Sequence, residues 1–188
     1  VVAQFLSEIH GVESLQNVIV TGASNRQDLI DPAVLRPGRL DLKVKVSRPD
    51  GAAAREIFRK YLTSNLPIHQ SAFERYGNDA EDVCLGLIDE VIANMYSTGE
   101  ENKFLEVTYA KGEREIFYFK DFASGAMIEN IVARAKRKAV KRMIDDGDGG
   151  IRYEDMIDSV REEFKENEDL PNTTNPDDWA RISGRKGE

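Results

Sequence analysis

Three side chains near the start of the chain have the chemistry to act on a phosphate group. Asn25 follows the run NVIVTGAS, and Arg36 and Arg39 stand on either side of Pro37-Gly38. A side-chain amide carries a donor and an acceptor at fixed geometry, so Asn25 can bond both a phosphate oxygen and an attacking water. A guanidinium group stays protonated at neutral pH and suits the charge on a phosphoryl group during transfer.

Each of these residues also has a structural interpretation. Asn25 can instead cap the turn into the next segment. The two guanidinium groups can be neutralised by carboxylates close by in the sequence, which are Asp28, Asp31 and Asp41. Taken alone, spacing does not decide between an ion pair and phosphoryl transfer.

The elements around these residues would place them at the edge of a sheet. NVIVTGAS is a short β-branched apolar run, which predicts a buried parallel strand. In open α/β sheets ligands gather at the carboxyl ends of strands, and Asn25 lies just past that end. The sequence LKVKVSRP alternates apolar and polar residues, which predicts a second strand with one buried face.

The two arginines are expected on a stiff corner. Asp31-Pro32 predicts an N-cap and the first position of a short helix over 32–35. Pro37 disfavours helical geometry at the residue before it, and Gly38 permits a sharp bend. The corner would hold Arg36 and Arg39 close together and pointing away from the sheet.

After the turn signal Arg48-Pro49-Asp50-Gly51, the pattern becomes mainly helical. Apolar residues at helical spacing predict helices over 53–62, 82–95, 125–143 and 153–164. Between the second and third of these, FLEVTYAKGEREIFYF predicts a β-hairpin around Lys111-Gly112. A two-residue loop there would place Val107 opposite Ile116 and Leu105 opposite Tyr118.

Composition excludes several classes of function. The 188 residues carry a net charge of -8, which disfavours bulk binding to nucleic acid. No apolar run approaches the roughly 20 residues of a membrane helix. With one cysteine, Cys84, and two histidines, the chain cannot form an internal disulfide or the usual zinc sites. We expect an intracellular protein without structural metal, and the initial Val1 suggests a fragment of a longer one.

Several motifs that resemble functional sites have simpler interpretations. LGLIDE imitates a magnesium-binding strand but fits an amphipathic helix. DDGDGG lacks the ligand pattern of a calcium loop and is expected to end a helix. Cys84 is expected in the core, and His10 and His69 as bystanders. A solvated helical face, or contact with a neighbouring subunit or acidic partner, explains the basic cluster Arg134, Arg137, Lys138, Lys141 and Arg142.

The whole string from Thr21 to Asp41, TGASNRQDLIDPAVLRPGRLD, closely resembles the second region of homology of the AAA ATPases. The resemblance implies that Asn25 is the sensor-1 residue. It also implies that Arg36 and Arg39 are arginine fingers, which reach the nucleotide of the next subunit in a hexameric ring. The implied cofactor of the full-length protein is ATP with Mg2+.

A second string, DFASGAMIENIVARA, is similar to the start of the sensor-2 helix in the lid of this family. The resemblance implies that Ser124, Gly125 and Ala126 lie against the adenosine. Small residues there allow a ligand to approach the helix N-terminus closely. The sequence has no arginine at this point, which is similar to AAA proteins proper rather than to the wider superfamily.

The hairpin and the tail ENEDLPNTTNPDDWARISG make the resemblance narrower, to the actinobacterial proteasome-associated ATPases called Mpa or ARC. That family implies a cytoplasmic homohexameric unfoldase that threads proteins, some bearing the modifier Pup, into the 20S proteasome. The expected fold is α/β followed by a helical lid. Residues 1–48 would form the C-terminal part of the AAA α/β subdomain, 49–168 the lid with its hairpin at about 103–120, and 169–188 a polar tail.

The chain departs from a complete ATPase of this kind. It contains no GxxxxGK[ST] phosphate loop, no magnesium-binding acidic strand, no pore loop and no N-terminal coiled coil. It also lacks the Gly-Gln-Tyr-Leu ending with which such ATPases dock on the proteasome. We therefore expect the chain alone to be inactive and to supply no metal ligand. Two alternatives remain: an AAA unfoldase or disassembly ATPase that works without a proteasome, and a non-catalytic assembly module.

Overall fold

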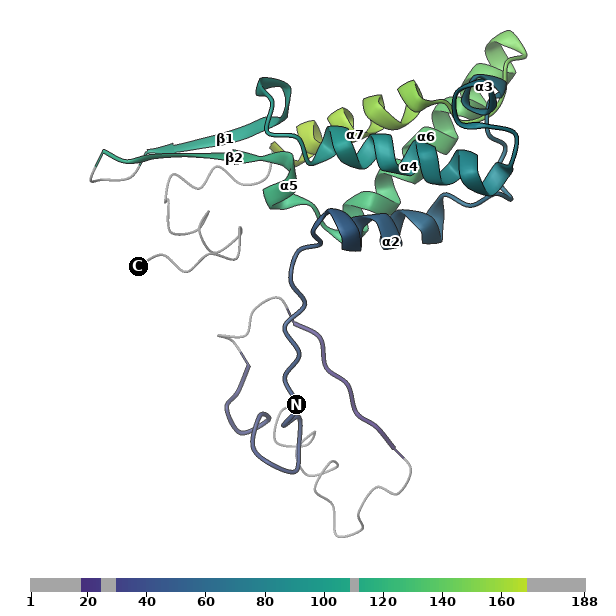
Figure 1. The fold of residues 1–188 in the computed structure, drawn as a ribbon. Helices are drawn as coiled ribbons and strands as arrows, with labels where there is room; N and C mark the ends of the chain where they lie inside the picture. The colour runs from purple at the N-terminus through teal and green to yellow at the C-terminus, as the bar shows by residue number, and fades with distance from the viewer. Residues whose placement is uncertain (1–17, 25–29, 109–111, 169–188) are drawn as a thin grey trace. The chain divides into compact units, whose positions relative to one another are not determined.

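The computed structural model describes residues 18–24, 30–108 and 112–168 (Figure 1). The chain divides into two compact units, Val1–Val46 and Ser47–Glu188, and each is described by itself. Of the helices in the described ranges, none is long and apolar enough to cross a membrane.

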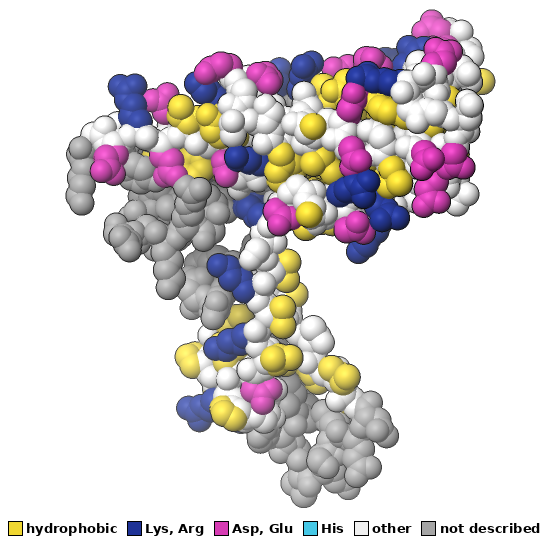
Figure 2. Space-filling view, in the orientation of Figure 1, with side chains coloured by type: hydrophobic (Ala, Val, Ile, Leu, Met, Phe, Trp, Pro, Cys, Tyr) yellow, Lys and Arg dark blue, Asp and Glu magenta, His cyan; other side chains and the backbone are white. Residues whose placement is uncertain are grey.

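The first unit differs from the predicted α/β layer. The described residues of NVIVTGAS and all of LKVKVSRP have no strand partner in the described part of the chain. Strands require such a partner for their backbone hydrogen bonds. The apolar side chains that a sheet would bury are instead exposed, by 93% at Ile19, 84% at Leu42 and 91% at Val46, and Figure 2 shows such side chains along this unit.

The second unit is mainly helical, as predicted, with a small two-stranded sheet. Its main helices are α2 (Gly51–Tyr61), α4 (Ala80–Met95), α6 (Gly125–Asp146) and α7 (Tyr153–Glu168). Its shorter elements are α3 (Gln70–Tyr76), the 3-10 helix η2 (Glu100–Asn102), β1 (Lys103–Thr108), β2 (Arg114–Tyr118) and α5 (Phe119–Phe122). Figure 1 shows the hairpin projecting from one end of the helices and α3 lying at the other end.

One hydrophobic core joins the four main helices and the base of the hairpin. α6 packs along α7, and α2 packs against both α4 and α6. Phe58 of α2, Leu87 of α4, Ile128 of α6 and Phe164 of α7 are fully buried. Phe119 of α5 stacks on Phe164 with 4.1 Å between ring centroids, which ties the end of the hairpin to α7.

The ends of the helices follow local sequence signals. Asp50 caps α2 by accepting from the N–H of Ala53, and Asp79 caps α4 in the same way. α6 ends within DDGDGG, where Gly147 takes a left-handed conformation with φ of 75°. This confirms the predicted helix terminator, and LGLIDE lies within α4 as predicted.

The hairpin forms, but its predicted register was wrong by one residue. Leu105 pairs with Phe117, and Val107 pairs with Glu115. The predicted loop had two residues, whereas residues 109–113 connect the paired ends of the strands. A slip of one residue moves a side chain to the opposite face, so Phe117 is buried and Ile116 is 37% exposed.

Candidate functional site

Hydrogen bonds within the first unit build the corner that carries the two arginines. The predicted helix over 32–35 consists of turns, in which the N–H of Val34 donates to the carbonyl of Asp31 at 2.9 Å. The side chain of Asp31 accepts from the N–H of Ala33 at 2.8 Å. Val34 is 9% exposed and accepts at its carbonyl from the N–H of Leu40 at 3.2 Å, which closes the corner.

Gly38 turns the chain between the arginines with φ of 80°, a conformation that L side chains rarely adopt. Its N–H donates to the carboxylate of Asp41 at 3.2 Å, and the N–H of Arg39 donates to the carbonyl of Arg36 at 3.1 Å. The bend predicted from Pro37-Gly38 is therefore present.

The carboxylates of this corner hold its backbone rather than its arginines. Asp31 and Asp41 accept from backbone N–H groups, and neither arginine forms an ion pair within the described ranges. Arg39 is half-buried and donates from Nη1 to the carbonyl of Ala33 at 2.5 Å, whereas Arg36 is exposed. The corner thus presents an exposed cation beside one that is tied to the backbone.

Two other residues of the predicted site cannot be placed. Asn25, the candidate for positioning water, lies outside the described residues, and so does Asp28, a possible partner of the arginines. Ser24 is described and exposed at the end of NVIVTGAS.

The second group of predicted site residues begins α6. Ser124 is the N-cap, and its Oγ accepts from the N–H of Met127 at 3.3 Å. Gly125 and Ala126 follow in the first turn, where helix N–H groups have no partner within the helix. In the described part of the chain no acceptor takes up the N–H groups of Gly125 and Ala126.

The space at Gly125 matches a site that a ligand could approach. A Cβ built there would meet Ile57 Cδ1 at 3.9 Å, an ordinary contact. Packing within the described residues therefore does not account for a glycine at this position. Free N–H groups at the start of a helix favour an acceptor such as a phosphate or an adenine nitrogen.

The two groups of site residues belong to different compact units. Arg36 and Arg39 share the corner of the first unit, and Ser124, Gly125 and Ala126 share the start of α6 in the second. Within the described ranges, no group of three or more His, Cys, Asp or Glu residues could hold a metal ion.

The basic cluster of α6 divides between two faces. Three of its members turn toward α7, where Arg134 pairs with Glu163, Lys138 with Glu162, and Arg142 with Asp155. The other two border an open hollow along the second half of α6, lined by Lys136, Arg137, Val140, Lys141, Ile144 and Asp145.

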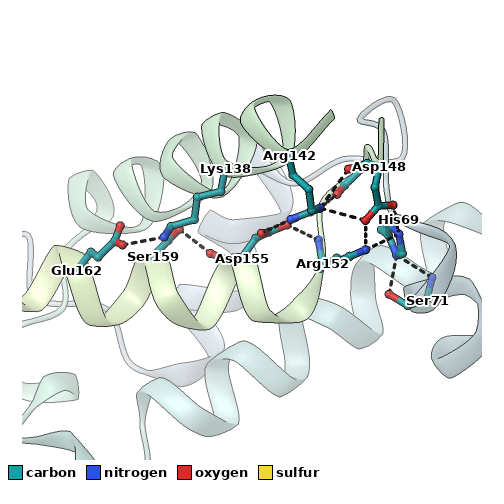
Figure 3. A network of polar contacts seen from close by, with 10 residues as sticks. His69, Ser71, Lys138, Arg142, Asp148, Arg152, Asp155, Ser159 and Glu162 are labelled. Atoms are coloured by element: carbon teal, nitrogen blue, oxygen red, sulfur yellow. Dashed lines mark hydrogen bonds and ion pairs between the residues drawn. The ribbon is translucent and has the colours of Figure 1, made fainter. Parts of the chain in front are cut away.

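His69 has a structural role that the sequence did not indicate (Figure 3). Its Nδ1 accepts from the N–H of Ser71 at 3.0 Å and so caps α3. His69 Nε2 forms a hydrogen bond with Asp148 Oδ1 at 2.8 Å and also lies 3.1 Å from Arg152 Nη2. Arg152 also pairs with Asp148. The hydrogen bond from His69 and the charge of Arg152 lower the pKa of Asp148.

Comparison with known proteins identifies both units. Residues 49–188 match a family model described as "ARC, AAA+ ATPase lid domain", and residues 1–48 match "ATPase family associated with various cellular activities (AAA)". Three similar relatives are named "Proteasome-associated ATPase". They come from Parafrankia sp. (strain EAN1pec), Beutenbergia cavernae and Mycobacterium avium (strain 104), and are 62%, 62% and 58% identical over 188 residues.

All three matches cover 100% of this chain but only 31%, 34% and 31% of the relatives. The chain therefore spans about a third of the length of these curated relatives. Since the lid model alone matches well over half of the chain, the chain belongs to the ARC family of AAA+ ATPases, to which that lid domain gives its description.

Proposed function

We propose that the whole protein containing this chain is a ring-forming ATPase that uses ATP hydrolysis to unfold proteins and move them into the 20S proteasome. The name shared by its relatives, "Proteasome-associated ATPase", is the observation that carries the proposal. The family matches to both units support it, since they cover an AAA segment and an ARC lid.

In this proposal Arg36 and Arg39 are arginine fingers that stabilise charge on the nucleotide of the neighbouring subunit. The corner supports the role because its carboxylates bond to backbone and leave Arg36 exposed and without an ion pair in the described ranges. Arg39 keeps guanidinium N–H groups besides the one that bonds to Ala33. Asn25 would orient the attacking water, since an amide can bond both water and phosphate.

The start of α6 would hold the adenosine of ATP. The small side chains of Gly125 and Ala126 allow close approach, and their N–H groups can donate to the ligand. Bound ATP with Mg2+ supplies the phosphoryl group that is transferred to water. Residues outside this chain would bind its phosphates and metal, so the chain alone should not hydrolyse ATP.

The assembly proposed is a cytoplasmic homohexamer, with Pup-bearing or other proteins as substrates, and without nucleic-acid or membrane partners. Residues 1–48 would complete the α/β subdomain of the whole protein, 49–168 its lid, and 169–188 a polar tail. Rotation of the lid would couple hydrolysis to pulling.

The arginine roles can be tested in the full-length hexamer. Arg36→Ala and Arg39→Ala should each lower kcat steeply, by up to about 10³- to 10⁵-fold by analogy with other phosphoryl-transfer enzymes. Arg55→Ala, which removes a lid ion pair with Asp89, serves as the control and should leave kcat near the unmodified value. Normal ATP hydrolysis by both finger variants would overturn the assignment.

Mixed rings can test whether the arginines act across the subunit boundary. Subunits with Arg39→Ala would be mixed with subunits whose phosphate loop has been disabled. If the finger acts on the neighbour, mixing restores part of the hydrolysis, because each intact nucleotide site can receive an intact finger. If the arginine acts within its own subunit, every mixture stays inactive.

The proteasome assignment needs a separate experiment. Full-length protein should retain the 20S core in a pull-down in the presence of ATP. Normal ATPase activity without retention would favour the alternative, an AAA unfoldase or disassembly ATPase that works without a proteasome.

A further inference from the structure

Three consecutive residues fasten the beginning of the second unit to three different elements. Arg48 Nη1 donates to the carbonyl of Phe122, and its Cζ lies 5.8 Å from the centroid of the Phe122 ring. Tyr96, at the end of α4, donates from its hydroxyl to the carbonyl of Pro49 at 2.7 Å. Asp50 caps α2. Residues 48–50, at the start of the second unit, are therefore held by bonds to other elements of that unit.

The contact of Arg48 is the one that reaches the proposed nucleotide site. Phe122 is the last residue of α5, and Ala123 alone separates it from Ser124, the N-cap of α6. Phe122 and Ala123 are 7% and 0% exposed. A bond to the carbonyl of Phe122 thus restrains the backbone just before the turn that carries Gly125.

The chemistry of this contact makes it a firm restraint. Arg48 is exposed as a residue, but partial desolvation of its guanidinium group lowers its pKa, an effect that the nearby carboxylate of Asp121 opposes. An arginine nevertheless stays charged at neutral pH, and a charged donor makes a stronger hydrogen bond than a neutral one. Stacking over the Phe122 ring adds a cation–π attraction. Backbone and ring of one residue are therefore held by one side chain.

We propose that Arg48 is a positioning residue for the nucleotide: it holds the turn from Phe122 to Ser124 so that the start of α6 keeps the geometry that binds adenosine. This inference rests on the function proposed above and adds a residue to it. By thermodynamic linkage, a nucleotide that favours this geometry also strengthens the contact of Arg48.

The experiment compares nucleotide affinity and turnover in the full-length hexamer. Arg48→Ala should weaken binding of a fluorescent ADP analogue and raise the KM for ATP about ten-fold, the loss expected for one charge-assisted hydrogen bond. The kcat should change much less, because the arginine fingers and the phosphate site are intact. Arg48→Lys keeps a charged donor and should recover part of the affinity.

Arg55→Ala is the matched control, because it also removes an arginine that bonds between elements of the same unit. Arg55 Nε donates to Asp89 Oδ1 at 2.5 Å, between α2 and α4. A purely structural effect would weaken ADP binding equally in both variants, or would lower kcat and leave KM unchanged. Either result, or unchanged affinity in Arg48→Ala, overturns the inference.

Gly125→Ala separates this inference from the proposed function. The added Cβ is accommodated within the described structure, since its contact with Ile57 is 3.9 Å, but it would narrow the approach to α6. Weaker ADP binding in Gly125→Ala with normal binding in Arg48→Ala rejects the role of Arg48 alone. Normal binding in both variants rejects the nucleotide site at α6 as well.

Discussion

The guanidinium group of Arg142 donates two parallel hydrogen bonds to the carboxylate of Asp155, from Nη1 to Oδ1 at 2.6 Å and from Nη2 to Oδ2 at 3.0 Å (Figure 3). The pair joins the last turns of α6 to the first turn of α7, and its side chains are only 16% and 9% exposed. Arg142 also donates to the carbonyls of Asp148 and Gly150, at 3.1 and 2.5 Å. One side chain thus fixes both the two helices and the loop between them.

Loss of this side chain should destabilise the second unit strongly. Arg142→Ala leaves the buried carboxylate of Asp155 without its charged partner, although the N–H of Arg152 still donates to it at 2.9 Å. We expect this loss to cost about 3 kcal/mol in the free energy of unfolding. Urea unfolding of the chain, followed by circular dichroism, measures the change. Arg161→Ala removes an exposed pair with Asp158 at 3.7 Å and should cost less than about 1 kcal/mol. Similar losses in the two variants would contradict the role of Arg142.

Two of the three glycines in the α6–α7 loop, Gly147 and Gly150, should respond differently to alanine. At Gly150, with φ of 95°, a Cβ would lie 2.5 Å from the backbone N of His69 and 2.7 Å from the carbonyl C of Ile68. Backbone atoms cannot move aside cheaply, so Gly150→Ala should cost more than about 3 kcal/mol. Gly147 has φ of 75° but no atom within 4 Å of a Cβ. Gly147→Ala should cost only about 1 kcal/mol, measured by the urea midpoint.

The observed hairpin register predicts which of two neighbouring residues supports the core. Phe117 is 3% exposed and packs in the core, whereas Ile116 lies on the outer face of β2. Phe117→Ala should cost about 3 to 5 kcal/mol, and Ile116→Ala less than about 1.5 kcal/mol. Thermal unfolding of the two variants gives the comparison. A larger loss of stability in Ile116→Ala than in Phe117→Ala would instead support the register expected from a two-residue loop.

Acid should weaken the contact between α3 and the α6–α7 loop. The hydrogen bond from His69 and the charges of Arg152 and Arg142 hold the pKa of Asp148 below its ordinary value of 3.8. The folded state then binds fewer protons here than the unfolded state, so stability rises with pH in this range. The contribution is complete above the ordinary pKa and is lost as the pH falls through the lower folded value.

The measurement is the urea midpoint of the chain between about pH 2 and pH 6. Asp148→Asn should reduce the dependence of the midpoint on pH, because it removes a carboxylate whose pKa differs between the two states. Asp158→Asn alters an exposed carboxylate that pairs with Arg161 and provides the control. If the slope is the same for Asp148→Asn and the unmodified chain, the contact with His69 does not contribute to acid stability.

The long helices were predictable because their apolar residues repeat over several turns. α4 and α6 begin and end within three residues of the predicted bounds, and α6 ends within DDGDGG, the run expected to terminate it. α3 and α5 were not predicted, since helices of 7 and 4 residues are too short to show a period. The cap of α3 is His69, a residue type that does not signal a helix start.

Features that depend on distant partners could not be predicted. The hairpin register depends on the length of the loop. Lys111-Gly112 indicated a loop of two residues, whereas residues 109–113 connect the paired ends of the strands. The divided roles of the basic residues on α6 depend on acidic residues of α7 that lie far along the sequence, such as Glu163 opposite Arg134. The predicted strands of the first unit need sheet neighbours that the described residues do not provide.

The candidate site was predictable as residue types and partly as local geometry. The bend at Gly38 and the start of a helix at Gly125 were both predicted from the sequence. Sequence alone did not show that Asp31 and Asp41 bond to backbone rather than to Arg36 or Arg39. The contact of Arg48 with Phe122 spans 74 positions and had no signal in the sequence.

A backbone bridge beside Gly150 joins two segments of the second unit that are far apart in the sequence, at Ile68 and Ile151. His69 donates from its N–H to the carbonyl of Ile151 at 3.1 Å, and Ile151 donates from its N–H to the carbonyl of Pro67 at 2.9 Å. The segment before α3 is thereby clasped to the segment before α7. Separating α7 from α3 requires both bonds to open, so amide hydrogens at the starts of these two helices should exchange together. In the proposed rotation of the lid, these bonds would help the second unit to turn as one rigid body.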